Sequence, residues 1–224
     1  MSALNIFNFQ HILYTVIGTV GTIGVIFLSK AYPNKVPKVV GILIFLVKLS
    51  ELTYRHLHWG EPIKGLLPLH LCNITLIFSV LVLVFRMDFL FEPMYYWGIG
   101  AIFAIILPDT KYGYRNFATI SFFVTHFFLL YSLLCCVLFF KLKPTLKGYW
   151  RSYIVINILA LIVFFINRGL GTNYMYLNGI RRSPVELPIF LQWPYYIIIL
   201  EVMYVIVTYL IYLPFKKENT ISIN

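Results

Sequence analysis

The sequence predicts an all-α fold, a polytopic membrane protein built as a bundle of seven transmembrane helices. Hydrophobic residues make up 60% of the 224 positions and charged residues only 12%, which is too apolar for a soluble domain of this length. Apolar runs of about 20 residues, long enough to cross about 30 Å of hydrocarbon, recur seven times. Because hydrocarbon offers the backbone no hydrogen-bond partner, each run is expected to be helical.

The seven runs follow one another at nearly regular spacing. They lie near residues 10–29, 37–57, 66–85, 89–107, 116–140, 150–167 and 192–213. We expect the first run to stay in the mature protein, because no Lys or Arg precedes it and no small-x-small cleavage site follows it. We find no internal repeat and no interdomain linker in the sequence, so residues 1–224 are predicted to form a single seven-helix membrane domain.

Basic residues in the short loops predict the orientation of the bundle. With the N-terminus outside, ten Lys and Arg face the cytoplasm and seven face outward. The cytoplasmic set is Lys30, Lys35, Lys38, Arg86, Lys141, Lys143, Lys147, Arg151, Lys216 and Lys217, and the outer set is Arg55, Lys64, Lys111, Arg115, Arg168, Arg181 and Arg182. We therefore expect a multi-pass protein of the cell membrane with an outer N-terminus and a cytoplasmic C-terminus.

The formal net charge of +10 is spread over these loops rather than gathered on one face. This pattern excludes a nucleic-acid surface and favours membrane phospholipids as partners. Outer arginines run against the positive-inside tendency, so Arg168, Arg181 and Arg182 are predicted to hold a lipid phosphate, with ordinary snorkelling at the interface as the alternative. The oligomeric state is left open.

One loop is long. Residues 167–196, between the sixth and seventh runs, combine helix-breaking Gly and Pro with several Tyr and Trp, and form either a cap over a cavity or an aromatic interface belt. The three cysteines are expected to be free thiols, because Cys135 and Cys136 are adjacent and Cys72 lies toward the opposite membrane face.

Ionisable residues inside the runs are costly in hydrocarbon, so each needs a partner or a task. Lys48, Glu51 and Arg55 share one face of the second run, at positions i, i+3 and i+7, and are predicted to form a structural ladder of ion pairs. His126 in the fifth run and Glu201 in the seventh are isolated in sequence. A histidine within a lipid-buried span is more often functional than one in a soluble core.

Depth can be counted from the nearest charged flank at about 1.5 Å per residue. Cys72 then lies about 12 Å below Lys64, and His126 about 16 Å below Arg115, so the two can share a level. Glu51 and Glu201 fall in the same outer half of the bundle. This one-sided clustering predicts a cavity that opens outward rather than a conduit across the membrane.

The stretch "LLPLHLCNITLI", residues 66–77, places His70, Cys72 and Asn73 close together. Pro68 suits a first helical turn, which puts Cys72 about one turn into the third helix. A thiol near a helix N-terminus with a histidine in reach is typical of a nucleophilic cysteine. We therefore predict acyl chemistry in which Cys72 attacks, His126 moves the proton, and His70 or Asn73 donates to the oxyanion.

The strings "LPLHLC", "LPD" at 107–109 and "GTNYMYL" at 171–177, with the histidine at 126, resemble the YwaF family of bacterial integral membrane proteins. That family is related to an animal transmembrane acyltransferase that remodels ether phospholipids. The resemblance implies a phospholipid acyltransferase without a cofactor, with Cys72 and His126 as the catalytic pair. His70, Asn73, Glu51 and Glu201 are predicted as supporting residues.

Two other functions remain open. A transporter of small molecules or lipids would also carry buried charges, but neither an inverted repeat nor polar residues in the inner half support it. A membrane lipid hydrolase that uses zinc is the second alternative. His56 and His58 are two positions apart and so lie on different helix faces, and no metal site is predicted.

Overall fold

The computed structural model describes residues 7–108, 113–179 and 192–216, and the regular elements in these ranges are helices. The α-helices are α1 (Phe9–Ala31), α2 (Val36–Trp59), α3 (Leu71–Phe85), α4 (Phe91–Gly98), α5 (Gly100–Ile106), α6 (Phe117–Leu138), α7 (Leu146–Leu170) and α8 (Tyr195–Tyr212). Short 3₁₀ turns are η1 (Ile63–Gly65), η2 (Asp88–Leu90), η3 (Tyr174–Tyr176) and η5 (Leu213–Phe215).

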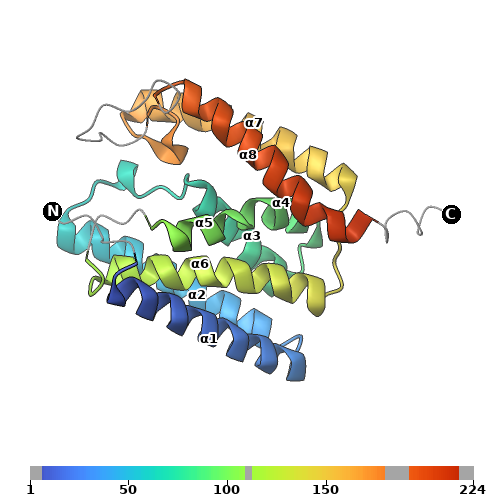
Figure 1. Ribbon diagram of the computed structural model, residues 1–224. Helices are drawn as coiled ribbons and strands as arrows, with labels where there is room; N and C mark the ends of the chain where they lie inside the picture. Colours follow the sequence, from blue (N-terminus) through green and yellow to red (C-terminus); the bar gives the residue numbers. More distant parts are fainter. Residues whose placement is uncertain (1–6, 109–112, 180–191, 217–224) are drawn as a thin grey trace.

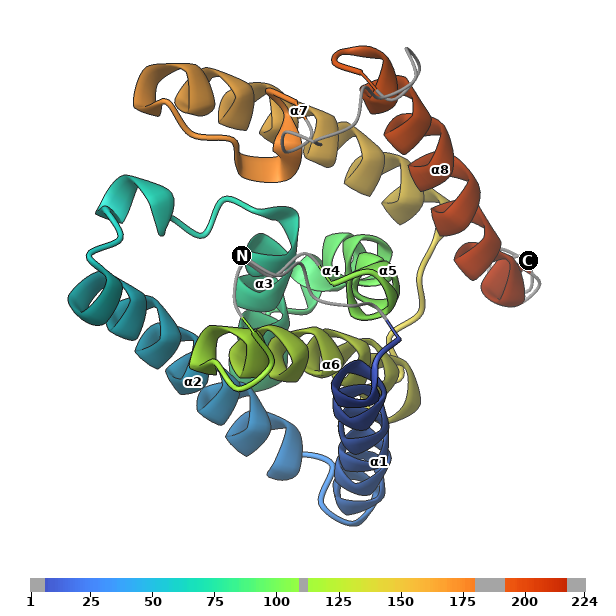
Figure 2. The same ribbon diagram turned by 60° about the vertical axis from the view of Figure 1, so that its left-hand side comes forward.

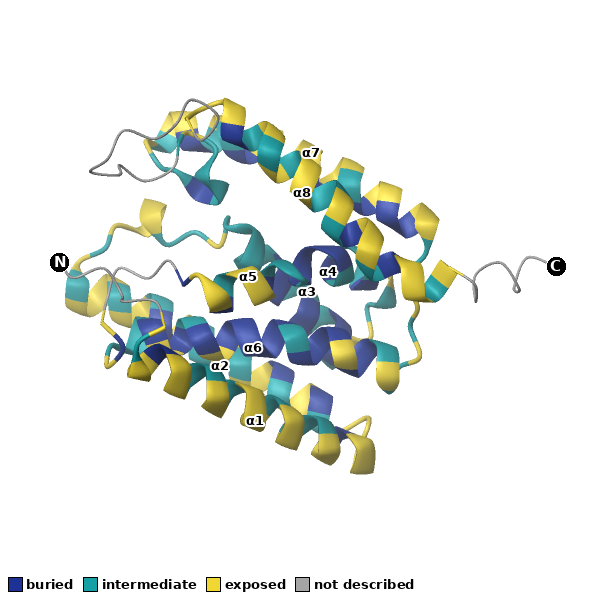
Figure 3. Cartoon of the chain, viewed as in Figure 1, coloured by how far each residue is buried: buried dark blue, intermediate teal, exposed yellow. Residues whose placement is uncertain are grey.

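Helix α6 is the central element of the bundle. It packs against α1, α2, α3, α4 and α5. In Figures 1 and 2, α7 and α8 lie together on one side, and α3, α4 and α5 lie between them and the layer of α1, α2 and α6. Figure 3 shows buried residues concentrated on α4 and α6, whereas α1, α7 and α8 carry long exposed stripes. Exposed apolar stripes on the outer helices are the surfaces that lipid covers in a membrane protein.

Each of the seven predicted runs contains helix, and the prediction of an all-helical membrane protein is confirmed. Among the described residues, five segments are long and apolar enough to cross a membrane: Phe9–Ala31, Asp88–Ile106, Phe117–Leu138, Leu146–Leu170 and Tyr195–Phe215. Helix α2 has 24 residues but carries several charges, and α3 has only 15 residues, about 22 Å of helix. That all seven runs cross the membrane therefore stays a prediction.

Two predicted helices have different bounds in the structure. The third begins at Leu71 rather than Pro68, because His70 is still extended (φ −70°, ψ 142°) and its carbonyl accepts the first helical bonds. The fourth is not continuous: η2, α4 and α5 replace it, with a break at Ile99. Gly98 and Gly100 flank that break, and glycine has a low helix propensity.

Hydrogen bonds of buried side chains join neighbouring helices within and between the layers. Ser29 Oγ of α1 and Tyr131 Oη of α6 are 2.7 Å apart in the buried interface of these helices. On the other side of the bundle, Tyr96 Oη of α4 donates to the carbonyl of Thr145 at 2.9 Å, just before α7. Glu92 of α4 accepts from the Thr145 amide N–H at 3.1 Å, so α4 helps to hold the start of α7. Buried polar groups without such partners would be costly in a membrane core.

Candidate functional site

Cys72 is the second residue of α3 and is partly buried. It packs against the largest apolar cluster, which includes Leu76 and Leu129. The first amide N–H groups of a helix have no intrahelical acceptor and give that end a partial positive charge. The start of α3 therefore holds the thiol closer to the helix N-terminus than the sequence analysis expected, in a position where the helix dipole favours an anion.

His126 lies in the middle of α6 and is only 7% exposed. Its Nδ1 is 2.6 Å from the carbonyl oxygen of Phe122, and its ring lies 4.0 Å from the Phe122 ring, centroid to centroid. Because a carbonyl oxygen only accepts hydrogen bonds, Nδ1 must carry the proton. In the neutral ring the other nitrogen, Nε2, then has a free lone pair and can act as a base.

A serine pair fixes the register of α3 against α6. Ser132 Oγ of α6 donates to Ser79 Oγ of α3 at 3.0 Å. The two helices run in the same direction, because the guanidinium of Arg86, which follows α3, lies 3.8 Å from the Phe140 ring, which follows α6. Counting back from the serine pair, Cys72 lies about 10 Å and His126 about 9 Å toward the helix starts, so the prediction of a shared level is supported.

The same register shows how the two side chains are directed. Cys72 is seven residues before Ser79 and so projects from the face of α3 that meets α6. His126 is six residues before Ser132, which turns its side chain about 120° around α6 from that face. In the part of the chain that the structure describes, no hydrogen bond joins the Cys72 thiol to the His126 ring.

Lys48 of α2 lies beside α3, where it lines a small groove together with Asn73 and Leu76. Helix α2 packs against both α3 and α6. The ladder of ion pairs was predictable from the spacing within α2, but that spacing could not show that Lys48 also lies against α3.

The predicted ladder on α2 is confirmed. Lys48 Nζ lies 2.6 Å from Glu51 Oε2, and Arg55 Nη1 lies 2.9 Å from Glu51 Oε1. Arg55 Nη2 also pairs with Glu61 Oε2 at 2.6 Å, one residue beyond the left-handed Gly60 that ends α2. Glu51 itself is 2% exposed, so its carboxylate lies between two cations in a nearly dry site. This network holds Lys48 in place beside α3.

Asn73 lies on the side of α3 that meets α2. It lines a narrow groove of about 100 Å³ between α2 and α3, together with Lys48. The other walls are apolar and come from Phe45, Leu49, Leu52, Pro68, Leu76 and Ile77. The surface that these residues present to the groove is apolar, and its volume suits only a few methylene groups of a lipid chain.

His70 connects the start of α3 to the segment after α7. The amide N–H of Met175 donates to His70 Nδ1 at 3.3 Å, and the His70 ring meets the Tyr174 ring edge-on at 5.1 Å. Since Nδ1 accepts this bond, the neutral ring carries its proton on Nε2 and keeps a donor there. Met175 adopts a left-handed backbone (φ 55°), which is strained for a residue with a side chain.

Asn167, which the sequence analysis did not single out, anchors this segment. Its Nδ2 donates to the Tyr174 carbonyl at 2.9 Å, and its Oδ1 accepts from the Tyr174 amide N–H at 2.8 Å. Tyr174 Oη donates to the carbonyl of Lys64 at 2.9 Å. Burial raises the pKa of Tyr174, so its hydroxyl stays protonated as a donor. The described part of the long loop thus folds against the start of α3, as a cap would.

Other predicted residues lie elsewhere. Glu201 of α8 accepts from Asn157 Nδ2 of α7 at 3.4 Å, and no described contact joins it to Cys72 or His126. Arg168, in the last turn of α7, lies over the Phe164 ring at 5.4 Å. Arg181 and Arg182 lie outside the described residues. Within the described ranges, no group of three His, Cys, Asp or Glu side chains could hold a metal ion.

The fold defines a class: an all-helical membrane protein in which α2, α3 and α6, the helices that carry Lys48, Cys72 and His126, pack against one another. A family model described as the TMEM164 family matches residues 6–212, and the chain belongs to that family. It is also similar to an uncharacterized protein of Treponema pallidum (strain Nichols), 25% identical over 184 residues, 80% of this chain and 74% of that protein. No solved structure matches the chain.

Proposed function

We propose that this protein is a phospholipid acyltransferase of the membrane that works through Cys72 and His126. The observation that carries the proposal is the serine pair between α3 and α6, whose register places Cys72 and His126 at similar heights in the bundle. Membership of the TMEM164 family fits the likeness noted in the sequence, and the narrower kinship with YwaF-like proteins is part of the proposal.

In the first half-reaction, the Cys72 sulfur attacks the carbonyl carbon of a phospholipid ester. A C–S bond forms and the ester C–O bond breaks, which leaves the acyl group on Cys72 as a thioester. His126 Nε2 takes the thiol proton and returns it to the departing alkoxide, so a lysophospholipid leaves as a neutral alcohol. The Nδ1–H bond to the Phe122 carbonyl keeps the ring in the tautomer that this step needs.

The second half-reaction reverses the first with a new acceptor. His126 takes the proton of a lysophospholipid hydroxyl, the oxygen attacks the thioester carbonyl, and the C–S bond breaks to restore the thiol. The two side chains are directed apart in the resting register, so this direct proton transfer requires them to turn toward each other when the substrate binds. Water in place of the acceptor alcohol would make the same site a hydrolase.

The groove between α2 and α3 has apolar walls and can take a few methylene groups of the acyl chain in this scheme. Asn73, which lies beside it, is a candidate donor to the oxygen that becomes negative in the transition state. His70 Nε2–H is the further candidate donor from the sequence analysis. Glu51 acts only through Lys48, which it holds at 2.6 Å. Glu201, bonded to Asn157, has no part in this scheme.

The membrane arrangement that goes with this proposal has seven crossings, with the N-terminus outside and the C-terminus in the cytoplasm. Helices α2 and α3 then both cross, although α2 is charged and α3 short. The charges of Lys48, Glu51 and Arg55 are paired within α2, and this pairing lowers the free-energy cost of placing them in the bilayer. Cys72 lies in the outer half, where Arg168 and, beyond the described residues, Arg181 and Arg182 hold the lipid phosphate.

The test is an acyl-transfer assay in vesicles that contain a phospholipid donor and a lysophospholipid acceptor. Cys72→Ala and His126→Ala are each expected to remove nearly all transfer, and the double variant to be little worse, because members of one catalytic unit are not additive. Mass spectrometry should find an acyl group on Cys72 when the acceptor is left out. Cys136→Ala is the matched control, since Cys136 is fully buried beside α3 and outside the site.

Full transfer by Cys72→Ala would remove the covalent mechanism. Transfer that survives His126→Ala but not Cys72→Ala would keep the thioester and assign the proton to another group. If the wild-type protein moves a lipid or small solute across sealed vesicles without any change in its acyl chains, the transporter reading replaces the enzyme.

A further inference from the structure

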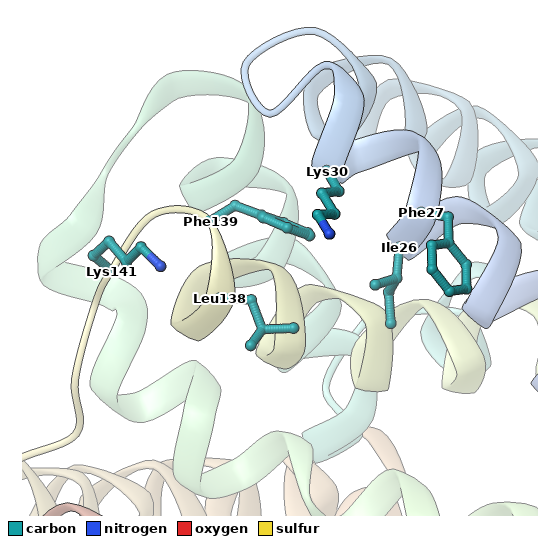
Figure 4. Close-up of a pocket in the computed structure, with 6 residues that line it drawn as sticks. All are labelled: Ile26, Phe27, Lys30, Leu138, Phe139 and Lys141. Carbon is teal, nitrogen blue, oxygen red and sulfur yellow. The ribbon is translucent and has the colours of Figure 1, made fainter.

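A second groove lies between the ends of α1 and α6, at the opposite end of the bundle from Cys72. It has a volume of about 410 Å³ and is lined by Ile26, Phe27, Lys30, Leu138, Phe139 and Lys141. Figure 4 shows Lys30 coming from α1 and Lys141 from the segment after α6, with the Phe139 ring between them. Four of the six walls are apolar, and the two polar ones are cations.

Among the residues that the structure describes, neither lysine has an anionic partner. Within the described ranges, the ion pairs join Lys48 and Arg55 to Glu51, Arg55 to Glu61, and Arg86 to Asp88. Neither Lys30 nor Lys141 takes part in one, and both are exposed. Their positive field is therefore available to an anion that comes from outside the chain.

The backbone presents Lys141 in an unusual way. Its φ is 58°, in the left-handed region where glycine is the favoured residue. Backbone N–H groups satisfy two carbonyls near the end of α6: Phe139 donates to Cys135 at 2.9 Å and Leu142 donates to Cys136 at 3.1 Å. No hydrogen bond of the Lys141 ammonium is found among the described residues, so it can serve a ligand.

The position of the groove in the membrane limits what can occupy it. Helices α1 and α6 have 23 and 22 residues and belong to the segments long enough to cross a bilayer. At 1.5 Å per residue each is about 33 Å long, so their ends lie at the level of lipid headgroups. An occupant must then place hydrocarbon against Ile26, Phe27 and Leu138 and a negative group at the lysines.

We infer that this groove binds an anionic phospholipid, with its phosphate beside Lys30 and Lys141 at the headgroup level and one acyl chain along the apolar walls. The site is separate from the proposed catalytic one. Cys72 is the second residue of α3, whereas Arg86, just past the other end of α3, lies beside the segment that follows α6. A lipid here is a bound structural or regulatory partner, and its presence does not depend on acyl transfer.

The experiment measures lipid binding to the purified full-length protein in detergent, by native mass spectrometry, with phosphatidylglycerol and phosphatidylcholine of identical chains. The wild-type protein is expected to retain phosphatidylglycerol in preference. Lys30→Gln and Lys141→Gly should each weaken that retention about fivefold, and together about 25-fold, as for loss of one and two lysines near an anionic lipid. Lys141→Gly also relieves the left-handed backbone, so its effect cannot come from a weakened fold.

Lys38→Gln is the matched control. Lys38 is exposed near the start of α2, on the same side of the membrane, and does not line the groove. It should leave retention unchanged. An equal loss in Lys38→Gln would mean a diffuse surface field instead of a site, and equal retention of both lipids would overturn the proposal. Displacement of the lipid by inorganic phosphate would assign the lysines to a free anion. Should Lys30→Gln fail to fold, Lys141→Gly alone decides.

Discussion

The hydroxyl of Ser132 on α6 donates to the hydroxyl of Ser79 on α3 at 3.0 Å, and both residues are fully buried. Ser79 donates its own hydroxyl proton to the Thr75 carbonyl, and the single hydroxyl proton of Ser132 is shared between Ser79 and the Leu129 carbonyl. The pair therefore adds little stability but marks a close contact between two helices. Small residues at such contacts let helices approach in a membrane. This contact sets the relative level of Cys72 and His126.

The serine pair yields the first prediction. Ser79→Ala should lower the free energy of unfolding by about 0.6 kcal/mol, the average for interhelical hydrogen bonds in membranes, and leave acyl transfer nearly intact. Ser79→Val should cost about 1–3 kcal/mol, because the larger side chain pushes α3 away from α6, and should reduce transfer as well. Thermal unfolding in detergent and the vesicle assay measure both. A fully active and stable Val variant would show that this contact does not position the site.

The Glu51 carboxylate is the second test. Glu51→Gln leaves Lys48 without its anion and Arg55 with only Glu61, so we expect a loss of about 3–5 kcal/mol in unfolding free energy, as for a broken buried pair. Asp88→Asn is the control. It breaks the exposed pair with Arg86 and should cost at most about 1 kcal/mol. Equal midpoints of thermal unfolding for the two variants would contradict the buried network.

Packing of α1 on α6 gives a third prediction. A Cβ built on Gly18 would lie 2.1 Å from the Phe127 ring, whereas one on Gly21 would meet nothing within 4 Å. Gly18→Ala should therefore destabilise the protein by about 1–3 kcal/mol, because the Phe127 ring must move within an aromatic cluster. Gly21→Ala should leave stability unchanged or raise it by up to about 1 kcal/mol, because alanine has the higher helix propensity. The opposite order of the two variants in a thermal unfolding series would rule out this packing.

A single cysteine placed in the turn between α2 and α3 distinguishes seven membrane crossings from five. If α2 and α3 both cross, the turn between them lies outside; if neither crosses, it stays on the side where α1 ends. Lys64 is exposed in that turn, and only its carbonyl is bonded to Tyr174. With seven crossings and an outer N-terminus, Lys64→Cys in intact cells should react with a membrane-impermeant maleimide. Lys38→Cys should react with the same maleimide only after the cells are permeabilised. The reverse pattern would remove the proposed topology.

Local features of this protein followed from the sequence alone. Apolar runs of about 20 residues predicted helices wherever the structure has them, because hydrocarbon leaves the backbone no other way to bond. The ion pairs of Lys48, Glu51 and Arg55 were predictable for the same reason, since residues three and four apart on a helix are neighbours whatever surrounds it. These inferences concern contacts that a helix makes with itself.

Contacts between helices needed the tertiary structure. Three contacts depend on which faces of distant helices meet: Lys48 lies beside the groove next to Asn73, His70 accepts from Met175, and Glu201 bonds to Asn157 of α7. The start of α3 at Leu71 and the break at Ile99 also follow from packing as much as from propensity. Composition and period determined that this chain is helical and membrane-embedded. The fit of side chains between helices decided the register of each helix pair and the direction of each side chain. The same apolar pattern is compatible with many different helix pairings.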